Sequence, residues 1–562
     1  MTTIGCGQAP AVPVSSPQDV AWRRLSTDVL QDYFKRHPTA AADLGVHDYD
    51  DRIEDASAAA VADELSATRG FLARVGAIDP AGLSAADQID REFLTRVLEA
   101  SVLELDVIKP WARDPDTYSS GLTNAAYVLI KRTFAPPEVR MRALTARMKA
   151  MPAVLQEAQT NLVNPPRVYT EIAIQQLDGN RAFFETAAAD AFPGVTDAAL
   201  VAEFNQARVG VMQALAGYKQ WLQQELLPMS SGDFAYGADT YRRRLAAEEM
   251  VDTPLESLLQ TAEADLRKNQ EAFAQTARLI DPKKSAAAVL AAVERDHPAA
   301  GDLLSTTQRE LDALAQFIRD RRIVSVPDAP PVQVKETPPF LRATTSASMD
   351  IPGPFETHAS EAYYNMTLPD PAWPPREREA FMGQWYYPAI TNVSVHEVWP
   401  GHYLQFLYSR RLSSDIRKVF GAATNSEGWA HYVEQMMIDE GFHADDPRYR
   451  LAQLQDALLR DARFIVGIRM HTQGMSVKEA EAFFEREAYQ SEPVARAESK
   501  RGTSDATYGY YTMGKLAILQ LREEYKARMG SAYSLQSFHD AFIKCGPIPI
   551  PLVRREILGP QG

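Results

Sequence analysis

The segment "SVHEVWPGHYLQF", residues 394–406, contains the residue types of a zinc site. In a His-Glu-x-x-His helix, two imidazoles four residues apart lie on one face and bind one metal, and the glutamate accepts a proton from water. Here the fourth position after His396 is Pro400, and the next histidine is His402. The segment can form a metal site only if the chain returns His402 to the side of His396.

Six residues on a regular helix correspond to a rotation of about 600° and a rise of about 9 Å, so an unbroken helix would point the two imidazoles to different sides. Pro400 lacks a backbone N–H and clashes with the preceding turn, while Gly401 tolerates unusual dihedral angles. We therefore expect an interruption at 399–401 that brings His396 and His402 together on one metal.

A catalytic zinc site also needs a third protein ligand and a nearby carboxylate that accepts a proton from water. Glu397 fits the role of this base. The segment "NSEGWAHYVEQMMIDEG", residues 425–441, predicts an amphipathic helix with Glu427, His431 and Glu434 on one face. From the spacing alone, both Glu427 and His431 remain candidates for the third ligand.

The composition limits both the ligands and the partners. Cys6 and Cys545 are the only cysteines among 562 residues, so a metal must be bound by histidines and carboxylates. A formal net charge of −15 argues against nucleic acid or an anionic membrane as the partner. A small or peptide substrate is compatible with this charge, and a homodimer is left open.

The location is predicted from what the chain lacks. No apolar run of about 18 residues could span a bilayer. The N-terminus has no basic and no apolar region of a signal peptide, so Cys6 is not expected to carry a lipid. We therefore predict a cytoplasmic protein.

The chain divides into three predicted parts. Residues 1–17 are rich in Pro and small residues and indicate a disordered leader. Residues 18–320 show helical periodicity and predict a helical lobe. Residues 321–562 predict a catalytic lobe in which "FLRATTSASM" and "EAYYNMTL" are strands and the remainder is mostly helical. The predicted fold class is mainly α with a small sheet beside the active-site helix.

Two motifs carry a resemblance to a known family. "HEVWPGHYLQ" and "SEGWAHYVE" resemble the bacterial family catalogued as domain of unknown function 885, whose members carry His-Glu-x-x-Pro-Gly-His and Glu-Gly-Trp-Ala. "HPTAAADLGVHDYDDRIEDAS" near residues 37–57 and "YYTMGKLAILQLR" at 510–522 are similar to further segments of that family. The resemblance covers nearly the whole chain.

The family looks like zinc-dependent peptidases. The interval of 25 residues from His402 to Glu427 is similar to that in thimet-oligopeptidase-like enzymes, which are mainly helical with a deep channel between two lobes. The resemblance implies a large two-lobed, metallopeptidase-like fold with a deep cleft. It also implies one Zn²⁺ per chain, bound by His396, His402 and Glu427, with Glu397 as general base. It disfavours His431, which stands where relatives are expected to have an apolar residue.

The resemblance also suggests an oxyanion donor. Tyr511, in a matched Tyr-x-x-Gly motif, is the candidate that would donate to the tetrahedral oxyanion of peptide hydrolysis. Tyr508 and Tyr510 are weaker alternatives. Tyrosines are also common at half-buried structural positions, which is the competing interpretation of all three.

Residues 460–484 resemble another family segment but depart from it. Arg463 and His471 match, and His471 is a candidate contact to substrate or oxyanion, with a structural hydrogen bond as the alternative. Gly467 and Met475 stand where the family usually has Asp and Trp, which puts a carried-over role of this helix in doubt.

The segment "SEAYYNMTLPD", residues 360–370, is predicted to form a strand along the cleft whose edge pairs with an extended peptide. Tyr363, Tyr364 and Asn365 are the candidate substrate contacts. The alternative is that the tyrosines only pack the sheet against helices.

The predicted function is zinc-dependent hydrolysis of short peptides by a metal-activated water with Glu397 as base. The same constellation would serve a metal-dependent amidohydrolase acting on a non-peptide amide. A third alternative is a catalytically silent helical binding protein that retains the motif.

Overall fold

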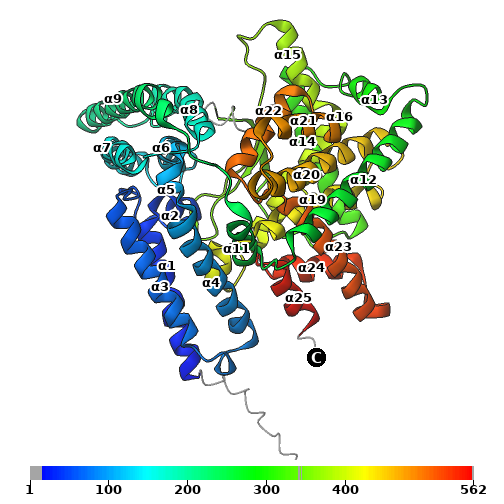
Figure 1. Cartoon of the computed structure of the whole chain (residues 1–562), viewed down its shortest axis with the longest axis horizontal. Coiled ribbons are helices and arrows are strands. Elements are labelled where there is room, and N and C mark those ends of the chain that lie inside the picture. Colours follow the sequence, from blue (N-terminus) through cyan, green and yellow to red (C-terminus); the bar gives the residue numbers. More distant parts are fainter. Residues whose placement is uncertain (1–15, 339–341, 343–344, 560–562) are drawn as a thin grey trace, which may run out of the picture.

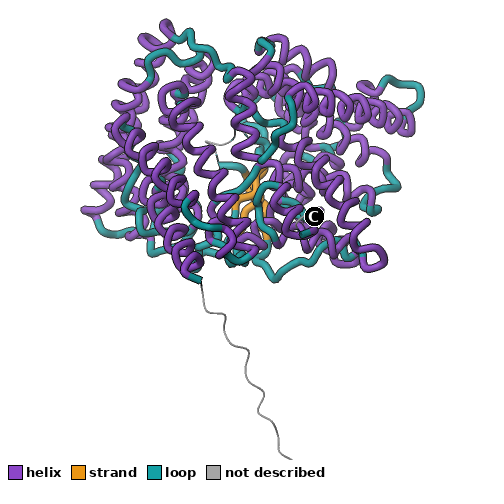
Figure 2. The backbone as a smooth tube through the Cα atoms, turned by 60° about the horizontal axis from the view of Figure 1, so that its bottom comes forward, coloured by secondary structure: helices purple, strands orange, loops and turns teal. Residues whose placement is uncertain are grey.

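The computed structural model describes residues 16–338, 342 and 345–559, which form a mainly helical protein with a small sheet (Figure 1, Figure 2). The mainly α prediction is confirmed. Cys6 and most of the predicted leader lie outside the described residues, and the first helix begins at Pro17. None of the helices in the described part of the chain combines the length and the apolarity that a membrane span requires.

The helices that precede the sheet occupy most of the chain up to residue 321. They are α1 (Pro17–Arg36), α2 (Pro38–Leu44), α3 (Ala58–Gly76), α4 (Ala85–Leu103), α5 (Pro110–Arg113), α6 (Pro115–Ile130), α7 (Pro137–Asn161), α8 (Arg167–Glu185), α9 (Ala198–Trp221), α10 (Leu227–Met229), α11 (Gly237–Glu249), α12 (Leu255–Ile280), α13 (Ala286–Val293) and α14 (Leu303–Arg321). Helices α6–α9 lie at the left of Figure 1, away from the elements that carry the candidate site.

The helices that follow the sheet include those with the chemistry-bearing motifs. They are α15 (Pro375–Met382), α16 (Tyr387–Glu397), α17 (His402–Ser409), α18 (Asp415–Val419), α19 (Ala423–Asp439), α20 (Pro447–Thr472), α21 (Val477–Ala488), α22 (Glu492–Ser504), α23 (Tyr510–Met529), α24 (Leu535–Lys544) and α25 (Ile550–Leu558). Helix α19 packs along α23, and α20 packs along α12 from the first half of the chain.

The sheet has the strand order β1-β3-β2 in the described residues. Strand β3 (Ala362–Met366) is in the middle, parallel to β1 (Val332–Glu336) and antiparallel to β2 (Ala347–Asp350). The segments predicted as strands supply β3 and most of β2, although part of "FLRATTSASM" lies outside the described residues. Strand β1 was missed, because prolines on both sides of "VQVKE" made it look like a loop despite its alternating valines.

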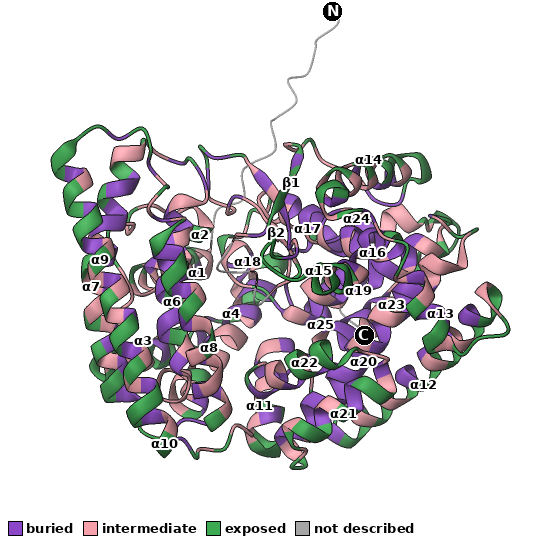
Figure 3. Cartoon of the chain, turned by 90° about the horizontal axis from the view of Figure 1, so that it is seen from above, coloured by how far each residue is buried: buried purple, intermediate pink, exposed green. Residues whose placement is uncertain are grey.

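The hydrophobic core does not follow the predicted boundary at residue 320. One cluster of buried residues in the described chain joins Trp22 and Phe93 to Trp385 and Trp429. Another cluster joins buried side chains of α12 to those of α20. Figure 3 shows buried residues in the helices of both parts of the chain. The two parts of the chain therefore stabilise each other.

The first half of the chain also anchors the sheet. Asp350, at the end of β2, accepts hydrogen bonds from Lys131 at 3.1 Å and Arg132 at 2.7 Å, both just beyond α6. His47, in the N-terminal segment that carries the family resemblance, contacts Glu356 at 3.0 Å in the loop after β2. These contacts fix the strand that lies nearest the candidate site.

Candidate metal centre

The chain is interrupted between the two histidines, as predicted. Helix α16 ends at Glu397, and α17 begins at His402. The N–H of Trp399 donates to the carbonyl of Ser394 at 3.2 Å, one residue beyond the usual helical partner. The peptide bond between Trp399 and Pro400 is cis. The helical path is therefore replaced by a tight turn that starts α17 beside the end of α16.

Gly401 is needed at this turn for space. A Cβ at this position would lie 1.8 Å from the carbonyl oxygen of His396 and 2.4 Å from that of Val395. The start of α17 therefore touches the backbone of α16 and leaves no room for a side chain.

This turn brings the predicted ligands together. The Nε2 atoms of His396 and His402 lie 3.3 and 3.4 Å from Oε2 of Glu427, which enters from α19. The two imidazole rings are 4.9 Å apart and nearly perpendicular. One potential ligand atom from each residue lies within 4.8 Å of the other two, and the described residues contain no second group of this kind. The predicted convergence of the two histidines is confirmed.

Each imidazole is oriented by a second contact. Nδ1 of His396 donates to Oε1 of Glu434 at 2.6 Å, and Nδ1 of His402 faces the side-chain oxygen of Gln405 at 3.3 Å. Glu434 is fully buried and is also bound by Arg460 at 3.0 Å. Such carboxylate and amide partners fix the tautomer that leaves Nε2 free for a metal.

The electrostatics of the cluster favour a positive charge between its members. Burial opposes ionisation of Glu427, but the neighbouring His402 and His396 hold its pKa well below the usual range. Burial likewise lowers the pKa of His396, but the carboxylates of Glu427 and Glu434 outweigh it and raise that pKa to about 10. Two carboxylates, of which that of Glu434 is fully buried, lie next to two imidazoles and thus favour a positive charge at this point.

Glu397, the predicted base, lies between the ligands and the sheet. Its Oε2 accepts a hydrogen bond from the backbone N–H of Met349 in β2 at 3.0 Å. Burial raises the pKa of its carboxyl group, which the nearby histidines partly offset. A carboxylate that is held in place and has a raised pKa is suited to accept and return a proton near neutral pH.

A cavity of about 840 Å³ opens on this side of the cluster. His396, Glu397 and Tyr511 line it, together with the three arginines Arg460, Arg463 and Arg501. The ring of Tyr511 is 6.3 Å from that of His396. The structure therefore brings Tyr511 into the same cavity as the ligand cluster and the predicted base.

The weaker tyrosine candidates have other surroundings. The hydroxyl of Tyr510 donates to Asp505 at 3.0 Å. Tyr508 is fully buried, and its ring lies where a Cβ on Gly467 or Gly502 would touch it. Gly467, the departure from the family pattern, thus makes room for this ring.

The remaining histidine candidates lie outside the ligand cluster. His471 is buried, with Nε2 donating to Gly502 O at 2.7 Å and Nδ1 accepting from Tyr236 N at 3.4 Å, which is the structural alternative considered for it. His431 donates from Nδ1 to Glu434 at 3.2 Å, and burial lowers its pKa to about 3. It is a neutral neighbour of the residue that orients His396.

The predicted edge role of the 360–370 strand is wrong, because β3 is paired on both sides. Tyr364 is completely buried, and Asn365 donates to Ser348 of β2 at 3.4 Å. Tyr363 lies under the ammonium group of Lys335 from β1, 3.6 Å from the ring centre. The strand with a free edge next to Glu397 is β2 instead.

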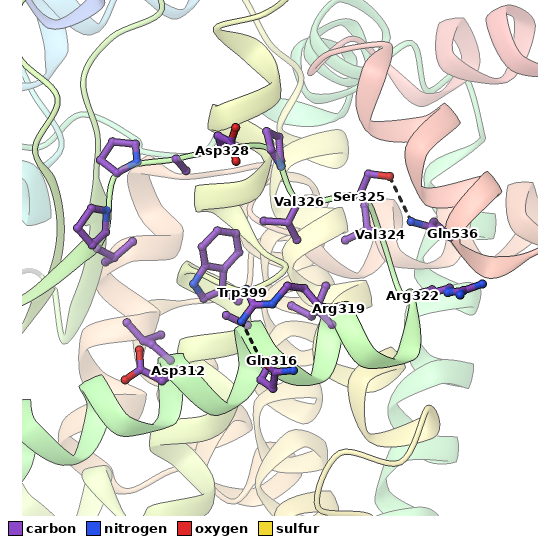
Figure 4. Close-up of a pocket in the computed structure, with 18 of the residues that line it drawn as sticks. Asp312, Gln316, Arg319, Arg322, Val324, Ser325, Val326, Asp328, Trp399 and Gln536 are labelled. Carbon is purple, nitrogen blue, oxygen red and sulfur yellow. Dashed lines mark hydrogen bonds between the residues drawn. The ribbon is translucent and has the colours of Figure 1, made fainter.

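A separate cavity of about 800 Å³ borders Trp399 of the turn (Figure 4). Helix α14 and the proline-rich segment before β1 line it, and Trp399 closes one side. None of the three potential ligands and neither Glu397 nor Tyr511 is among its lining residues. The candidate ligand His396 and the predicted base Glu397 thus face the cavity of about 840 Å³ and not this one.

Sequence reasoning named Glu434 without giving it a role and missed Gln405 and Arg460. Glu434 lies seven residues after Glu427 on one helix face, and Gln405 lies three residues after His402, so both spacings were available as signals. Arg460 comes from α20, and nothing in its local sequence indicates contact with Glu434.

The described chain is thus a mainly helical protein whose buried His-His-Glu cluster could hold a metal. It belongs to the family of bacterial proteins of unknown function DUF885, whose model matches residues 38–557. No curated protein matches the sequence.

Solved structures share the fold. The structure of "a putative lipoprotein of unknown function" from Shewanella oneidensis is 25% identical, with a TM-score of 0.79 over 96% of this chain and 99% of that chain. The crystal structure of "the putative lipoprotein" from Colwellia psychrerythraea is 17% identical, with a TM-score of 0.82 over 97% and 99% of the two chains. The fold therefore extends over nearly the full length of these proteins.

Proposed function

We propose that this protein is a zinc-dependent peptidase that hydrolyses short peptides, with His396, His402 and Glu427 as metal ligands. The observation that carries the proposal is the convergence of the three side chains from three helices within 4.8 Å. Their outer partners, Glu434 and Gln405, support it, because they orient Nδ1 of each histidine while both Nε2 atoms face Glu427.

The donor atoms fit zinc. Oε2 of Glu427 is buried and has no hydrogen-bond partner within the described residues, although it faces both Nε2 atoms. Two imidazoles and one carboxylate form the ligand set of many catalytic zinc sites, which keep one position open. No thiolate is close enough to favour a softer ion, since the described cysteine, Cys545, is buried outside the cluster.

The residues around the cluster suit hydrolysis of an amide bond. When bound, zinc supplies a Lewis acid that polarises a carbonyl and makes a water molecule acidic near neutral pH. Glu397 accepts the proton of the attacking water and passes it to the leaving amine. Tyr511 accepts a hydrogen bond from Arg501 at 3.5 Å, which leaves its own O–H available to donate to the developing oxyanion.

We further propose that the substrate binds along the free edge of β2 in a cleft of the metallopeptidase type. The N–H of Met349 points to Glu397, so this edge faces the site. The cavity with His396 borders Ala347 at one end of the strand. A second cavity of about 290 Å³ borders Met349 and Asp350 at the other end. An extended peptide paired with β2 would pass between them.

Metal content tests the ligand assignment. We expect one equivalent of zinc in the purified protein and loss of this zinc in His396→Ala and in Glu427→Ala. His358→Ala removes an exposed histidine and should keep the full equivalent. Quantitative metal analysis, together with a thermal melt that shows each variant folded, decides the result. A full equivalent of zinc in both ligand variants would contradict the assignment.

Turnover tests the chemistry separately. Glu397→Gln keeps the ligands but removes the base, so zinc should remain while hydrolysis falls by about 10²-fold or more. A panel of peptides and non-peptide amides distinguishes a peptidase from an amidohydrolase. A protein that retains zinc but hydrolyses neither class would instead be a binding protein.

A further inference from the structure

Three arginines surround Tyr511 in the wall of the cavity that His396 lines. The guanidinium carbons of Arg460 and Arg463 lie 5.4 and 5.1 Å from the centre of its ring. Arg501 reaches its hydroxyl from α22. All three arginines line the cavity, so three guanidinium groups, each paired with a carboxylate, stand next to the candidate metal centre.

Arg463 and Arg501 each have a hydrogen-bond donor group that no other described residue uses. Arg463 holds Glu498 through Nε and Nη2, both at 2.7 Å, and Arg501 holds Asp505 through Nε and Nη2. No partner within the described residues uses the Nη1 groups of Arg463 and Arg501. The Arg463 side chain is only 9% exposed, so its position is fixed by packing as well as by Glu498. A fixed guanidinium with free donors is suited to bind a carboxylate.

The direction of β2 relates this wall to one end of a bound peptide. The strand runs from Ala347, beside the arginine-lined cavity, to Asp350, beside the smaller cavity. Antiparallel strand pairs outnumber parallel ones in proteins. A peptide antiparallel to β2 would run from the smaller cavity toward the arginines, so its C-terminal side would enter the cavity that the arginines line.

We propose that Arg463 and Arg501 bind the C-terminal carboxylate of the substrate, so that the enzyme removes short fragments from the C-terminus of peptides. This inference rests on the proposed peptidase function. In the reaction, the C–N bond breaks, the hydroxyl of one water joins the acyl carbon, and its remaining proton goes to the amine of the released fragment.

The distances limit the length of that fragment. The Arg463 guanidinium is 5.1 Å from the Tyr511 ring centre, which is 6.3 Å from the ring centre of His396. An extended residue spans about 3.3–3.6 Å. A carboxylate on Arg463 therefore fits a fragment of about one to three residues beyond the bond that is cut.

The same cavity is lined by four further carboxyl groups that could bind the amino terminus instead, Glu294, Asp456, Glu485 and Glu498. Glu498 is already paired with Arg463, and Asp456 accepts a hydrogen bond from Asn392 at 2.5 Å. Burial raises the pKa of Glu294 and of Asp456, which disfavours their charged forms. The arginines are always charged and have unused donors, which favours recognition of the C-terminus.

Matched substrates give the first test. We would compare a peptide with a free C-terminus, its C-terminal amide and its N-acetyl form on the zinc-loaded enzyme. Amidation should lower kcat/KM by about 10- to 100-fold, the size of a lost hydrogen bond to a charged group, and N-acetylation should change it less than about threefold. Mass spectrometry should detect released C-terminal fragments of about one to three residues. Replacing a C-terminal Glu with Gln distinguishes the terminal carboxylate from an acidic side chain.

Variants give the second test. Arg501→Gln, and Arg463→Gln combined with Glu498→Gln to keep the charge balance, should each reduce the preference for the free acid over the amide by about 10-fold or more. Arg469→Gln removes a surface arginine of the same helix α20, paired with Glu263 at 2.8 Å, and should keep the full preference.

The outcomes separate this inference from the proposed function. Equal cleavage of the free acid and the amide, or an equal loss on both in the arginine variants, would show that the arginines only support Tyr511. A stronger effect of N-acetylation would assign the amino terminus to this cavity. If no peptide is cleaved, the proposed function fails, and binding of the acid and the amide to zinc-loaded Glu397→Gln still tests the arginines.

Discussion

Substitution of Gly401 with alanine should damage the candidate metal centre more than any other change of a single methyl group at the turn. The added Cβ would lie 1.8 Å from the carbonyl oxygen of His396. Since real Cβ contacts of this kind stay above 3.0 Å, α16 and α17 would have to separate by about 1.2 Å. This carbonyl belongs to His396, which is the first ligand. The residue that follows Gly401 is His402, which is the second ligand.

The size of this shift decides the expected effect. Metal–ligand distances tolerate only about 0.2 Å before a site is compromised. Overpacking in a buried region costs about 1–3 kcal/mol of the free energy of unfolding, which a protein of this size can survive. Gly401→Ala should therefore stay folded, weaken zinc affinity by about 10²-fold or more, and lose hydrolysis in parallel.

The assay is competition for zinc with a chelator of known affinity, alongside thermal unfolding of the metal-free protein. Gly210→Ala is the matched control, because a Cβ on this helix α9 residue meets nothing within 4 Å. It should keep zinc affinity and, if anything, raise stability, since alanine is the better helix former. Wild-type zinc affinity in folded Gly401→Ala would refute the contact between the two helices as the device that converges the ligands.

Two further predictions concern carboxylates around the site. Glu434→Gln should weaken zinc binding by about 10- to 100-fold, because the amide is a poorer acceptor for His396 Nδ1–H. The control Asp439→Asn, on the exposed side of α19, should keep the zinc affinity. If the two variants bind zinc with equal affinity, Glu434 does not orient His396. Burial raises the pKa of Glu249 to about 7, although hydrogen bonds from Thr424 and Ala423 oppose this. The folded state therefore binds the extra proton, and this group's contribution to stability falls as pH rises from about 4.5 to about 7. Glu249→Gln should flatten the pH dependence of Tm across that window, and an unchanged slope would contradict it.

The ligand cluster could be predicted from sequence because its requirements are local. A proline and a glycine between His396 and His402 demand a break in the helix, and Glu427 begins the next amphipathic segment. The helices could likewise be predicted from the spacing of apolar residues. In α12, for example, Leu258, Ala262 and Leu266 recur every four residues and are buried.

The order of the strands could not be predicted, because it depends on pairing between remote segments. The sequence of β3 is the most apolar and aromatic of the three strands, and it was assigned an exposed edge, whereas these residues are buried by neighbours on both sides. A strand that is paired on both edges and covered on both faces has the same apolar and aromatic sequence pattern as an edge strand that binds a peptide. The edge that faces Glu397 belongs to the shorter and more polar β2.

The contacts by which the first half of the chain positions the site also could not be predicted from local sequence patterns. The N-terminus of α19, the helix that carries Glu427, receives no cap from its own residues: its first N–H groups, on Ala423 and Thr424, donate to the buried carboxylate of Glu249 at 2.9 and 3.0 Å. Glu249 ends α11, some 170 residues earlier. A carboxylate there satisfies orphan donors and the positive end of the helix dipole. Because Asp350 is likewise held by Lys131 and Arg132, both the ligand helix and the edge strand are positioned by residues that carry no chemistry themselves.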